Sequence, residues 1–286
     1  MKKRSSIVAL FACVLGVVAL VLAGCGGGGS TESSSTSSTN ESAATSTKGS
    51  YTLVKDGTLT CVSELGFAPF EYLEAGSTEP IGYDIDVANE IAKRLGLSCS
   101  FLPSQDFDSL VPTIKEGGKA DIAIAGITIS DDRAKEIDFS DPYFESNLAL
   151  IVKSDSKETA ETLNAKDKKV ACQTGTTGDA WIEENLPDAE KVPLTDISAG
   201  LAGVSTGSYD AYVVDLPVAK KNLSDSFTDL TILEEIATGE QYGIAVSKNN
   251  PELTKAINGA LAEMQSDGTL QKIWDKWMVE ADVPEE

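Results

Sequence analysis

Two hydrophobic patterns alternate along residues 51–286. Short apolar runs, which are typical of buried strands, are followed by segments whose apolar residues recur every three or four positions, as on one face of an amphipathic helix. The clearest strand is residues 59–63, and the clearest helix is residues 84–95, which Gly96 is placed to end. Because strand–helix–strand units form parallel sheets with right-handed crossovers, the pattern predicts an α/β fold.

The same unit occurs twice, which predicts two lobes. The first set has strands at 59–63, 97–102 and 121–127 and helices at 84–95 and 107–116; the second has strands at 169–173 and 211–214 and a helix at 178–185. Extended apolar segments at 147–152 and 242–246 bracket the second set, and we interpret them as two crossings between lobes. Helices at 250–266 and 268–278 follow. We therefore assign residues 51–146 and 243–286 to lobe 1, and residues 147–242 to lobe 2.

Residues 1–24 have the pattern of a secretion signal. Lys2, Lys3 and Arg4 precede an apolar run over residues 7–23, which is shorter than the roughly 20 residues of a membrane-spanning helix. The run ends in small residues before Cys25 and resembles the lipobox of bacterial lipoproteins, in which the cysteine becomes the acylated N-terminus. We expect a lipid anchor at Cys25 on the outer face of the plasma membrane; the alternative is an N-terminal anchor that stays uncleaved.

Residues 25–50 continue as a Gly-, Ser- and Thr-rich tract with almost no large apolar side chain. Such a tract buries too little apolar surface to offset the entropy of ordering it, so we expect a flexible linker between the lipidated cysteine and the folded part.

Composition narrows the function by exclusion. The chain has 45 acidic and 23 basic residues and a net charge of −22, which argues against nucleic acid as a partner because phosphates attract a basic surface. Histidine is absent, which excludes histidine-based nucleophilic or general-base catalysis and histidine metal ligation. We expect no metal, no cofactor and a monomer.

The five cysteines have different expected roles. Cys13 leaves with the signal, Cys25 is acylated, and Cys172 is interpreted as a small buried hydrophobic residue. Cys61 and Cys99 lie in strands that we expect to be neighbours. A disulfide between them and two free thiols are both compatible with a location outside the cytosol.

Polar groups collect directly after the predicted strands, where ligands bind in open α/β sheets. The groups found there are one cation, one carboxylate, three hydroxyls and two aromatic rings: Arg133, Asp215, Thr128, Thr176, Thr177, Phe67 and Phe107. Arginine binds a carboxylate with two parallel hydrogen bonds, a carboxylate pairs with an ammonium group, and helix starts favour anions. The set suits a zwitterionic amino acid whose apolar stem the aromatic rings cover.

Over essentially all of residues 51–286, the sequence resembles the polar amino-acid-binding family (family 3) of ABC-importer solute-binding proteins. The motifs are PFEY at 69–72, GYDIDVANEIAKRLGL at 82–97, FDSLVPTI at 107–114, AGITISDDR at 125–133, IDFSDPYF at 137–144, TGTT at 174–177, DAYVVDLP at 210–217 and QYGIA at 241–245. Glutamine-binding and lysine/arginine/ornithine-binding proteins look most similar.

The resemblance implies the type II periplasmic-binding-protein fold, in which each of two lobes has a central, mainly parallel sheet flanked by helices and two strands form the hinge. It implies a binding protein rather than an enzyme. The lobes would close on an amino acid, and the closed form would dock on a separate ABC permease that a cytoplasmic ATPase drives.

The resemblance also implies residue roles. Arg133 matches the arginine that holds the α-carboxylate, helped by Thr128, Thr177 and the backbone at Gly126. Asp215 matches the aspartate that binds the α-ammonium group. Phe67 and Phe107 match two aromatic residues that sandwich the ligand.

Two further positions bear on selectivity. Glu64 matches an acidic position that contacts the ligand side chain, and Gln173 matches a position that is lysine in the glutamine binder. Val214 stands where the glutamine binder has histidine. The departures at Gln173 and Val214 argue against glutamine, and Glu64 favours lysine or arginine, with glutamine or cystine next.

Structural explanations compete with these roles. Arg133 could pair with a neighbouring aspartate, Asp215 could be only a helix cap, and Glu64 could face solvent. We interpret Asp84 and Asp86 as a helix N-cap and first-turn charge rather than a metal pair.

Two other functions compete with amino-acid delivery. One is a dehydratase-like enzyme on the same fold, which would use carboxylates as acid and base. The other is a ligand-sensing subunit for a membrane receptor.

Overall fold

The computed structural model describes residues 50–279, which lie within one compact unit. The predicted signal peptide, the acylation site Cys25 and the linker up to residue 49 lie outside the described residues. No helix among residues 50–279 is both long enough and apolar enough to cross a bilayer.

The first of two five-stranded sheets has the order β5-β1-β6-β13-β7. Its strands are β1 (Thr58–Val62), β5 (Ser98–Phe101), β6 (Ile122–Ala123), β7 (Asp138–Phe139) and β13 (Ala245–Val246). β1 pairs in parallel with β5 and β6, whereas β13 runs antiparallel to β6 and β7. The predicted parallel unit is therefore present, and a late strand from the far end of the chain completes the sheet.

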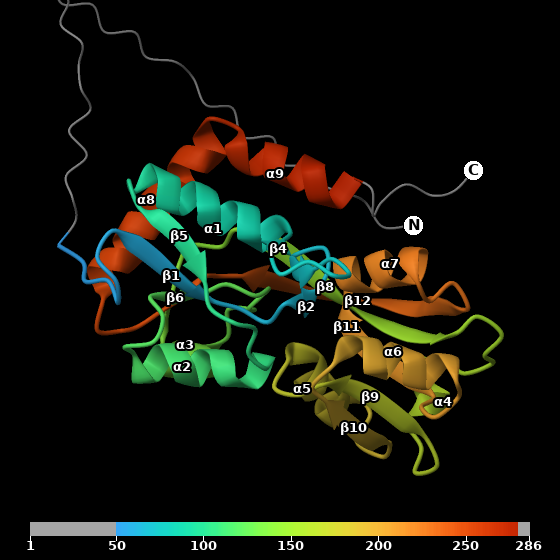
Figure 1. Ribbon diagram of the computed structural model, residues 1–286. Helices are drawn as coiled ribbons and strands as arrows, with labels where there is room; N and C mark the ends of the chain where they lie inside the picture. Colours follow the sequence, from blue (N-terminus) through green and yellow to red (C-terminus); the bar gives the residue numbers. More distant parts are fainter. Residues whose placement is uncertain (1–49, 280–286) are drawn as a thin grey trace, which may run out of the picture. The chain divides into compact units, whose positions relative to one another are not determined.

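Helices cover both faces of this sheet (Figure 1). One face carries α1 (Tyr83–Arg94), α8 (Pro251–Ser266) and α9 (Thr269–Met278); the other carries α2 (Leu110–Glu116, after a 3-10 turn at Phe107–Ser109) and α3 (Asp131–Glu136). Successive residues of β1 point to opposite faces, so Cys61 packs with α1 and α8 while Val62 packs with α2. Because helices cover both faces, all five residues of β1 are buried, Thr58 and Thr60 included.

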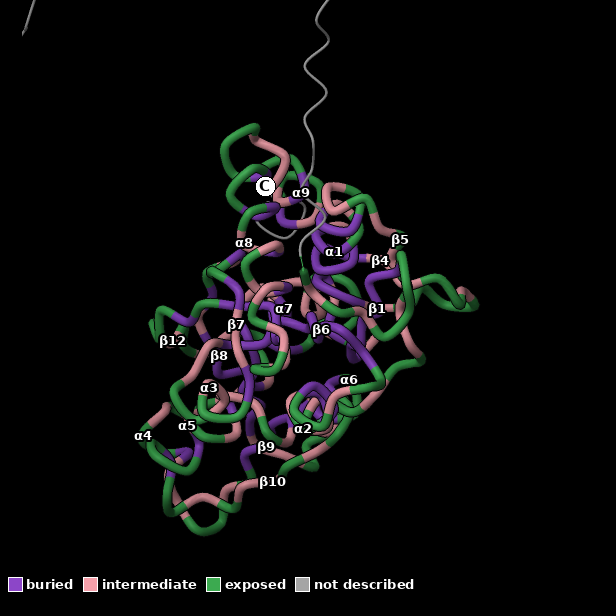
Figure 2. The backbone as a smooth tube through the Cα atoms, turned by 90° about the vertical axis from the view of Figure 1, so that its left-hand side faces the viewer, coloured by how far each residue is buried: buried purple, intermediate pink, exposed green. Residues whose placement is uncertain are grey.

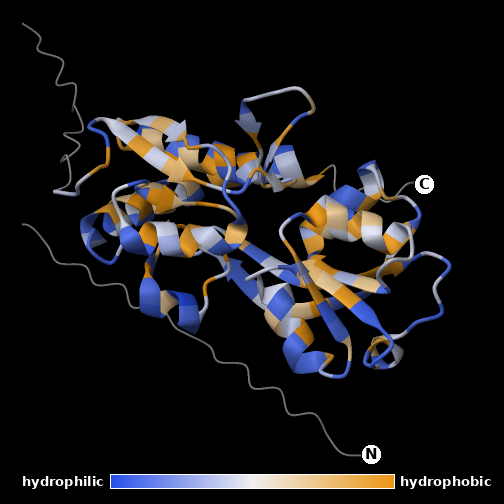
Figure 3. Ribbon diagram, turned by 60° about the horizontal axis from the view of Figure 1, so that its bottom comes forward, coloured by the Kyte–Doolittle hydropathy of each residue, from blue (hydrophilic) through white to orange (hydrophobic). Residues whose placement is uncertain are grey.

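The second sheet has the order β10-β9-β11-β8-β12. Its strands are β8 (Phe144–Lys153), β9 (Lys169–Gln173), β10 (Glu190–Leu194), β11 (Ala211–Asp215) and β12 (Leu230–Tyr242), and its helices are α4 (Ala160–Leu163), α5 (Thr177–Asn185), α6 (Ile197–Ser205) and α7 (Leu216–Asp225). β10, β9 and β11 are parallel to one another, and β8 runs antiparallel to both of its neighbours, β11 and β12. In Figure 2 the edge strand β10 carries only exposed and intermediate residues, and Figure 3 shows both apolar and polar residues along the helices.

A small antiparallel sheet was not predicted. It consists of β2 (Gly66–Phe67), β3 (Glu71–Leu73) and β4 (Pro80–Ile81). These strands are too short to produce a recognisable alternation, but they place the Phe67 ring beside the segment that follows β6.

The chain passes between the five-stranded sheets twice. The first crossing joins β7 to β8 at residues 140–143, earlier than the expected 147–152, which form the buried centre of β8. The second joins β12 to β13 at residues 243–244, within the expected 242–246. The crossings are hydrogen bonded to each other, since Ser140 N donates to Ile244 O and Tyr143 N donates to Tyr242 O. This pairing makes them a two-stranded connection.

Three local expectations have distinct outcomes. Gly96 follows α1 with a φ of 69°, as expected of the glycine that ends a helix. The N-cap of α1 is Gly82, so the interpretation of Asp84 as the N-cap was wrong; Asp84 is instead fully buried. Cys61 and Cys99 are free thiols whose Sγ atoms lie 3.6 Å apart, well beyond the roughly 2.05 Å of a disulfide.

Candidate functional site

The candidate residues come together where parallel strands of both sheets end. Glu64 follows β1, Thr128 follows β6, Gln173 ends β9 and Asp215 ends β11. Hydrogen bonds link these segments across the two sheets, as described below. The positions that the strand pattern predicted therefore lie together as one candidate site.

Arg133 lies in the first turn of α3 because Ser130 caps that helix and accepts a hydrogen bond from Arg133 N at 3.3 Å. Its Nη1 donates to Thr128 O at 2.7 Å, and its Nη2 donates to Gly175 O at 3.0 Å. The guanidinium carbon lies 5.3 Å from the centre of the Phe107 ring, within cation–π distance. These bonds use two of the five N–H donors, so further donors can bind an anion.

The alternative in which Arg133 pairs with a neighbouring aspartate is wrong. Asp132 pairs with Lys135 instead, with Nζ 2.6 Å from Oδ1. Burial lowers the pKa of Arg133, and the carboxylates of Asp215 and Glu240 act in the opposite direction. The guanidinium is therefore a partly desolvated cation, which strengthens its attraction for a carboxylate.

Asp215 ends β11 and precedes α7, with 5% of its surface exposed. It occupies the N-cap position of α7, as the helix-cap alternative expected, but its side chain makes no capping hydrogen bond to the helix. Its Oδ1 accepts a hydrogen bond from the Tyr242 hydroxyl. Burial, reinforced by repulsion from Glu240, raises the pKa of Asp215 to about 7. A cationic group bound here would stabilise the ionised form.

Glu64 and Gln173 form a buried pair that joins the two sheets. Gln173 Nε2 donates to Glu64 Oε1 at 2.7 Å and to Thr195 O at 3.1 Å. Glu64 is 8% exposed, so it does not face solvent, and burial raises its pKa to about 7 despite the bond from Gln173. Glu64 Oε2 and Gln173 Oε1 are buried acceptors without a hydrogen-bond partner among the described residues. Because buried polar atoms are normally paired, these two oxygens point to a ligand that brings donors.

Glu240 is a site residue that the sequence reasoning missed. It lies near the end of β12, is 9% exposed, and accepts from the hydroxyls of Thr128 at 2.8 Å and Thr177 at 2.9 Å, both on Oε2. The motif at 241–245 is adjacent, but Glu240 stands among exposed residues of β12, and no local pattern separates it from them.

Two predicted residues have their polar groups committed elsewhere. The Thr176 hydroxyl donates to Gln173 O at 2.8 Å and accepts from Asp179 N at 3.2 Å, so it caps α5. Gly126 N donates to Asp84 Oδ2 at 2.8 Å and is not available to a ligand carboxylate. Gly126 has a φ of 54°, and a Cβ there would lie 2.6 Å from Phe67 Cε1, so glycine allows the aromatic ring to approach this segment.

Asp84 is buried next to the candidate site and holds two segments there by hydrogen bonds. Its Oδ2 also accepts from the Tyr143 hydroxyl at 2.8 Å, and burial raises its pKa to about 6. Glu71 is fully buried beside it, and burial together with the Asp84 charge raises the pKa of Glu71 well above its usual range. Asp84 thus connects the start of α1, the first crossing and the segment that carries Thr128.

Phe67 and Phe107 differ in burial. Phe67 is 4% exposed and packs on Phe70, with ring centres 5.6 Å apart, whereas Phe107 is half-buried under Arg133. Phe70 is fully buried in the core.

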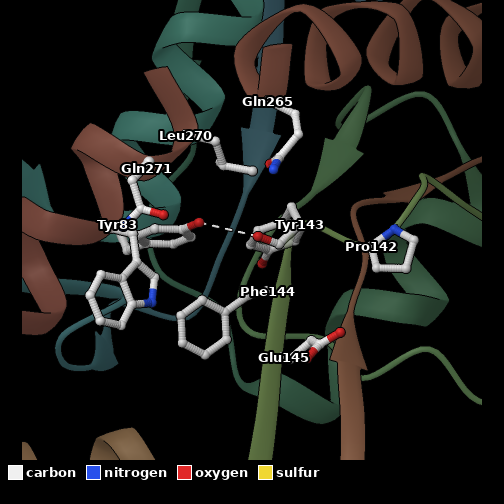
Figure 4. A pocket seen from close by; sticks show the side chains of 9 residues that line it. Tyr83, Pro142, Tyr143, Phe144, Glu145, Gln265, Leu270 and Gln271 are labelled. Atoms are coloured by element: carbon white, nitrogen blue, oxygen red, sulfur yellow. Dashed lines mark hydrogen bonds between the residues drawn. The ribbon is translucent and has the colours of Figure 1, made fainter. Parts of the chain in front are cut away.

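A separate pocket of about 300 Å³ lies beside the first crossing (Figure 4). Tyr83, Phe144, Trp274, Gln265 and Gln271 are among the residues that line it. The Tyr83 hydroxyl donates to Tyr143 O at 3.1 Å, which attaches the crossing to α1 (Figure 4). None of the candidate site residues lines this pocket.

Residues 59–280 match the model of the bacterial extracellular solute-binding proteins, family 3. The L-cystine-binding protein TcyJ of Escherichia coli (strain K12) is 32% identical over 232 residues, which cover 80% of this chain and 86% of the relative. The ABC transporter arginine-binding protein 1 of the same strain is 33% identical over 216 residues, covering 74% and 86%.

Solved structures of amino-acid-binding proteins are also similar to this chain. An ancestral arginine-binding protein bound to arginine is 39% identical, with a TM-score of 0.70, and covers 77% of this chain and 98% of the other. The ancestral amino acid-binding protein AncCDT-1, a precursor of cyclohexadienyl dehydratase, is 34% identical, with a TM-score of 0.72 and coverage of 78% and 96%. The two-sheet architecture is thus the two-lobe type II periplasmic-binding-protein fold, and the chain belongs to the bacterial extracellular solute-binding proteins of family 3.

Proposed function

We propose that this chain binds an amino acid with a cationic side chain, arginine above all, and delivers it to an ABC importer. The observation that carries this proposal is the pair of unpartnered buried acceptors, Glu64 Oε2 and Gln173 Oε1. A guanidinium or ammonium group would supply donors to both, whereas an acidic side chain would add acceptors beside acceptors. The arginine named for two of the similar proteins supports the same ligand.

The charges of the site favour a cation as well. The candidate site contains three buried carboxyl groups, Glu64, Asp215 and Glu240, and one guanidinium, Arg133. A neutral amino acid leaves this excess of negative charge unchanged, and a dibasic amino acid reduces it by one. In a buried site the difference is large because the effective dielectric constant is low.

In the proposed binding mode, Arg133 holds the α-carboxylate and Asp215 holds the α-ammonium group. The side chain extends between Phe67 and Phe107 toward Glu64 and Gln173. Arg133 donates to Gly175 O, in the turn after β9, and Glu64 accepts from Gln173, at the end of β9, so ligand capture and lobe closure would occur together.

The proposal extends to location and partners. Cys25 would be acylated and would attach the protein, as a monomer, to the outer face of the plasma membrane through the linker. The closed form would then meet a permease coupled to a cytoplasmic ATPase. Labelling with a palmitate analogue tests the anchor: wild type should incorporate it and Cys25→Ser should not.

Calorimetric titration of residues 50–286 against the twenty amino acids tests the ligand. We expect arginine to bind most tightly, lysine next, glutamine more weakly, and aspartate and glutamate not at all. Glu64→Gln should reduce affinity for arginine by at least about tenfold while affecting glutamine little, because only the charged partner is lost. Absence of binding to every amino acid, or tightest binding of an acidic one, would contradict the proposal.

A further inference from the structure

Glu240 connects hydroxyl groups from the two sheets at the site. Its Oε2 accepts from Thr128 Oγ1, in the segment after β6, and from Thr177 Oγ1, the first residue of α5. The carboxylate is 9% exposed and lies next to the second crossing. Its one oxygen therefore joins a residue beside the first sheet to a residue beside the second.

These two hydrogen bonds determine what the threonines can offer a ligand. A hydroxyl has a single proton to donate, and a carboxylate can only accept. With both protons directed to Glu240, the oxygens of Thr128 and Thr177 present only lone pairs to the rest of the site. Oxygens in this state accept from an ammonium group and repel a carboxylate.

We propose that Glu240 is a positioning residue that turns the hydroxyls of Thr128 and Thr177 into acceptors for the ligand's α-ammonium group, alongside Asp215. The proposal rests on the proposed function of amino-acid binding and differs from the resemblance, which groups both threonines with Arg133 around the α-carboxylate. It also makes the α-ammonium group a point at which both lobes are held.

The test compares two ligands that differ only in the α-amino group, L-arginine and 5-guanidinopentanoate. Glu240→Leu removes both carboxylate oxygens, so neither threonine can direct its proton to residue 240 and each hydroxyl becomes free to donate to the ligand. We expect Glu240→Leu to weaken L-arginine binding by at least about tenfold and to change 5-guanidinopentanoate binding by less than about threefold. Glu235→Leu, at an exposed position on the same strand, is the matched control and should alter neither affinity.

Each outcome separates this inference from the proposed function. A selective loss for L-arginine supports it. Equal loss for both ligands would show a merely structural role, and unchanged affinity for both would show no role; either result overturns the inference while leaving amino-acid binding intact. If wild type binds neither L-arginine nor any other amino acid, the proposed function fails and this inference fails with it.

Discussion

The carboxyl groups of Glu64 and Asp215 are ionisable groups held in an environment that disfavours their charge. Burial raises the pKa of each to about 7 from ordinary values of 4.5 and 3.8. Each has a single side-chain donor to offset the lost water, Gln173 for Glu64 and Tyr242 for Asp215. A cationic ligand would restore the charged state, so binding should release protons.

We expect affinity for L-arginine to rise with pH between about 5 and 8. Below about 7 both carboxyls are protonated in the ligand-free protein and must ionise to pair with the ligand, which costs up to about tenfold in affinity per pH unit for each group. Titration in two buffers of different ionisation enthalpy measures the proton release directly. Glu64→Gln should reduce the slope without abolishing it, and an affinity independent of pH would contradict the charge pairing.

In the ligand-free protein, the same two pKa shifts make the free energy of unfolding fall as pH rises, whereas ligand affinity rises with pH. Because both folded-state pKa values lie above the unfolded ones, the stabilisation that these groups contribute is fully present below about pH 4 and is lost as pH rises through about 7. Binding of a cationic amino acid should offset this loss of stability near neutral pH.

At the scale of elements, the start of α1 is built against the loop after β2. Tyr83 N donates to Pro69 O and Asp84 N to Phe70 O, so loop carbonyls satisfy the first N–H groups of the helix. Gly82 has a φ of 133°, and a Cβ there would lie 2.0 Å from Phe70 O. This junction fixes Asp84, which in turn holds Gly126.

Gly82→Ala should therefore destabilise the fold by more than about 3 kcal/mol, because a backbone atom must move. Gly96→Ala is the matched control: its φ is 69°, but no atom lies within 4 Å of the added Cβ, so it should cost about 1 kcal/mol. Urea unfolding followed by circular dichroism measures both. Equal costs would show that the contact with Phe70 O does not matter.

Elements were predictable from sequence where the pattern is local. The apolar stripe of α1 and the residues of β9 suffice to find them, and β9 coincides with the predicted 169–173. Within the predicted strand at 121–127, only Ile122–Ala123 is a strand. The remaining apolar residues are buried but lie outside it, so burial alone produced the apolar run. β2 to β4 escaped prediction because their pairing depends on a loop that the core holds in place.

At the scale of the whole molecule, Arg133 joins the lobes. It binds Thr128 O on one side and Gly175 O on the other while retaining donors for a ligand. Because these contacts reach both lobes, we expect closure to depend on Arg133.

Arg133→Ala should reduce affinity for L-arginine by more than about a hundredfold, since the α-carboxylate would be buried without a charge partner. Small-angle scattering should show that added ligand no longer reduces the radius of gyration. Arg94→Ala is the matched control, because Arg94 pairs with Glu90 and Asp267 far from the site residues. Retained affinity in Arg133→Ala would overturn the assignment.

The sequence by itself determined the repeated α/β units and the strand ends near which Arg133, Asp215, Glu64 and Gln173 lie. Those positions follow from periodicity and from the fixed geometry of parallel sheets, whereas the roles proposed for Glu64 and Gln173 came from the family resemblance. The tertiary structure alone decided where the chain crosses between lobes and that Glu240 faces two threonines. These features depend on contacts between segments about 60 to 110 residues apart, and such contacts leave no local pattern because packing, not spacing, brings the groups together.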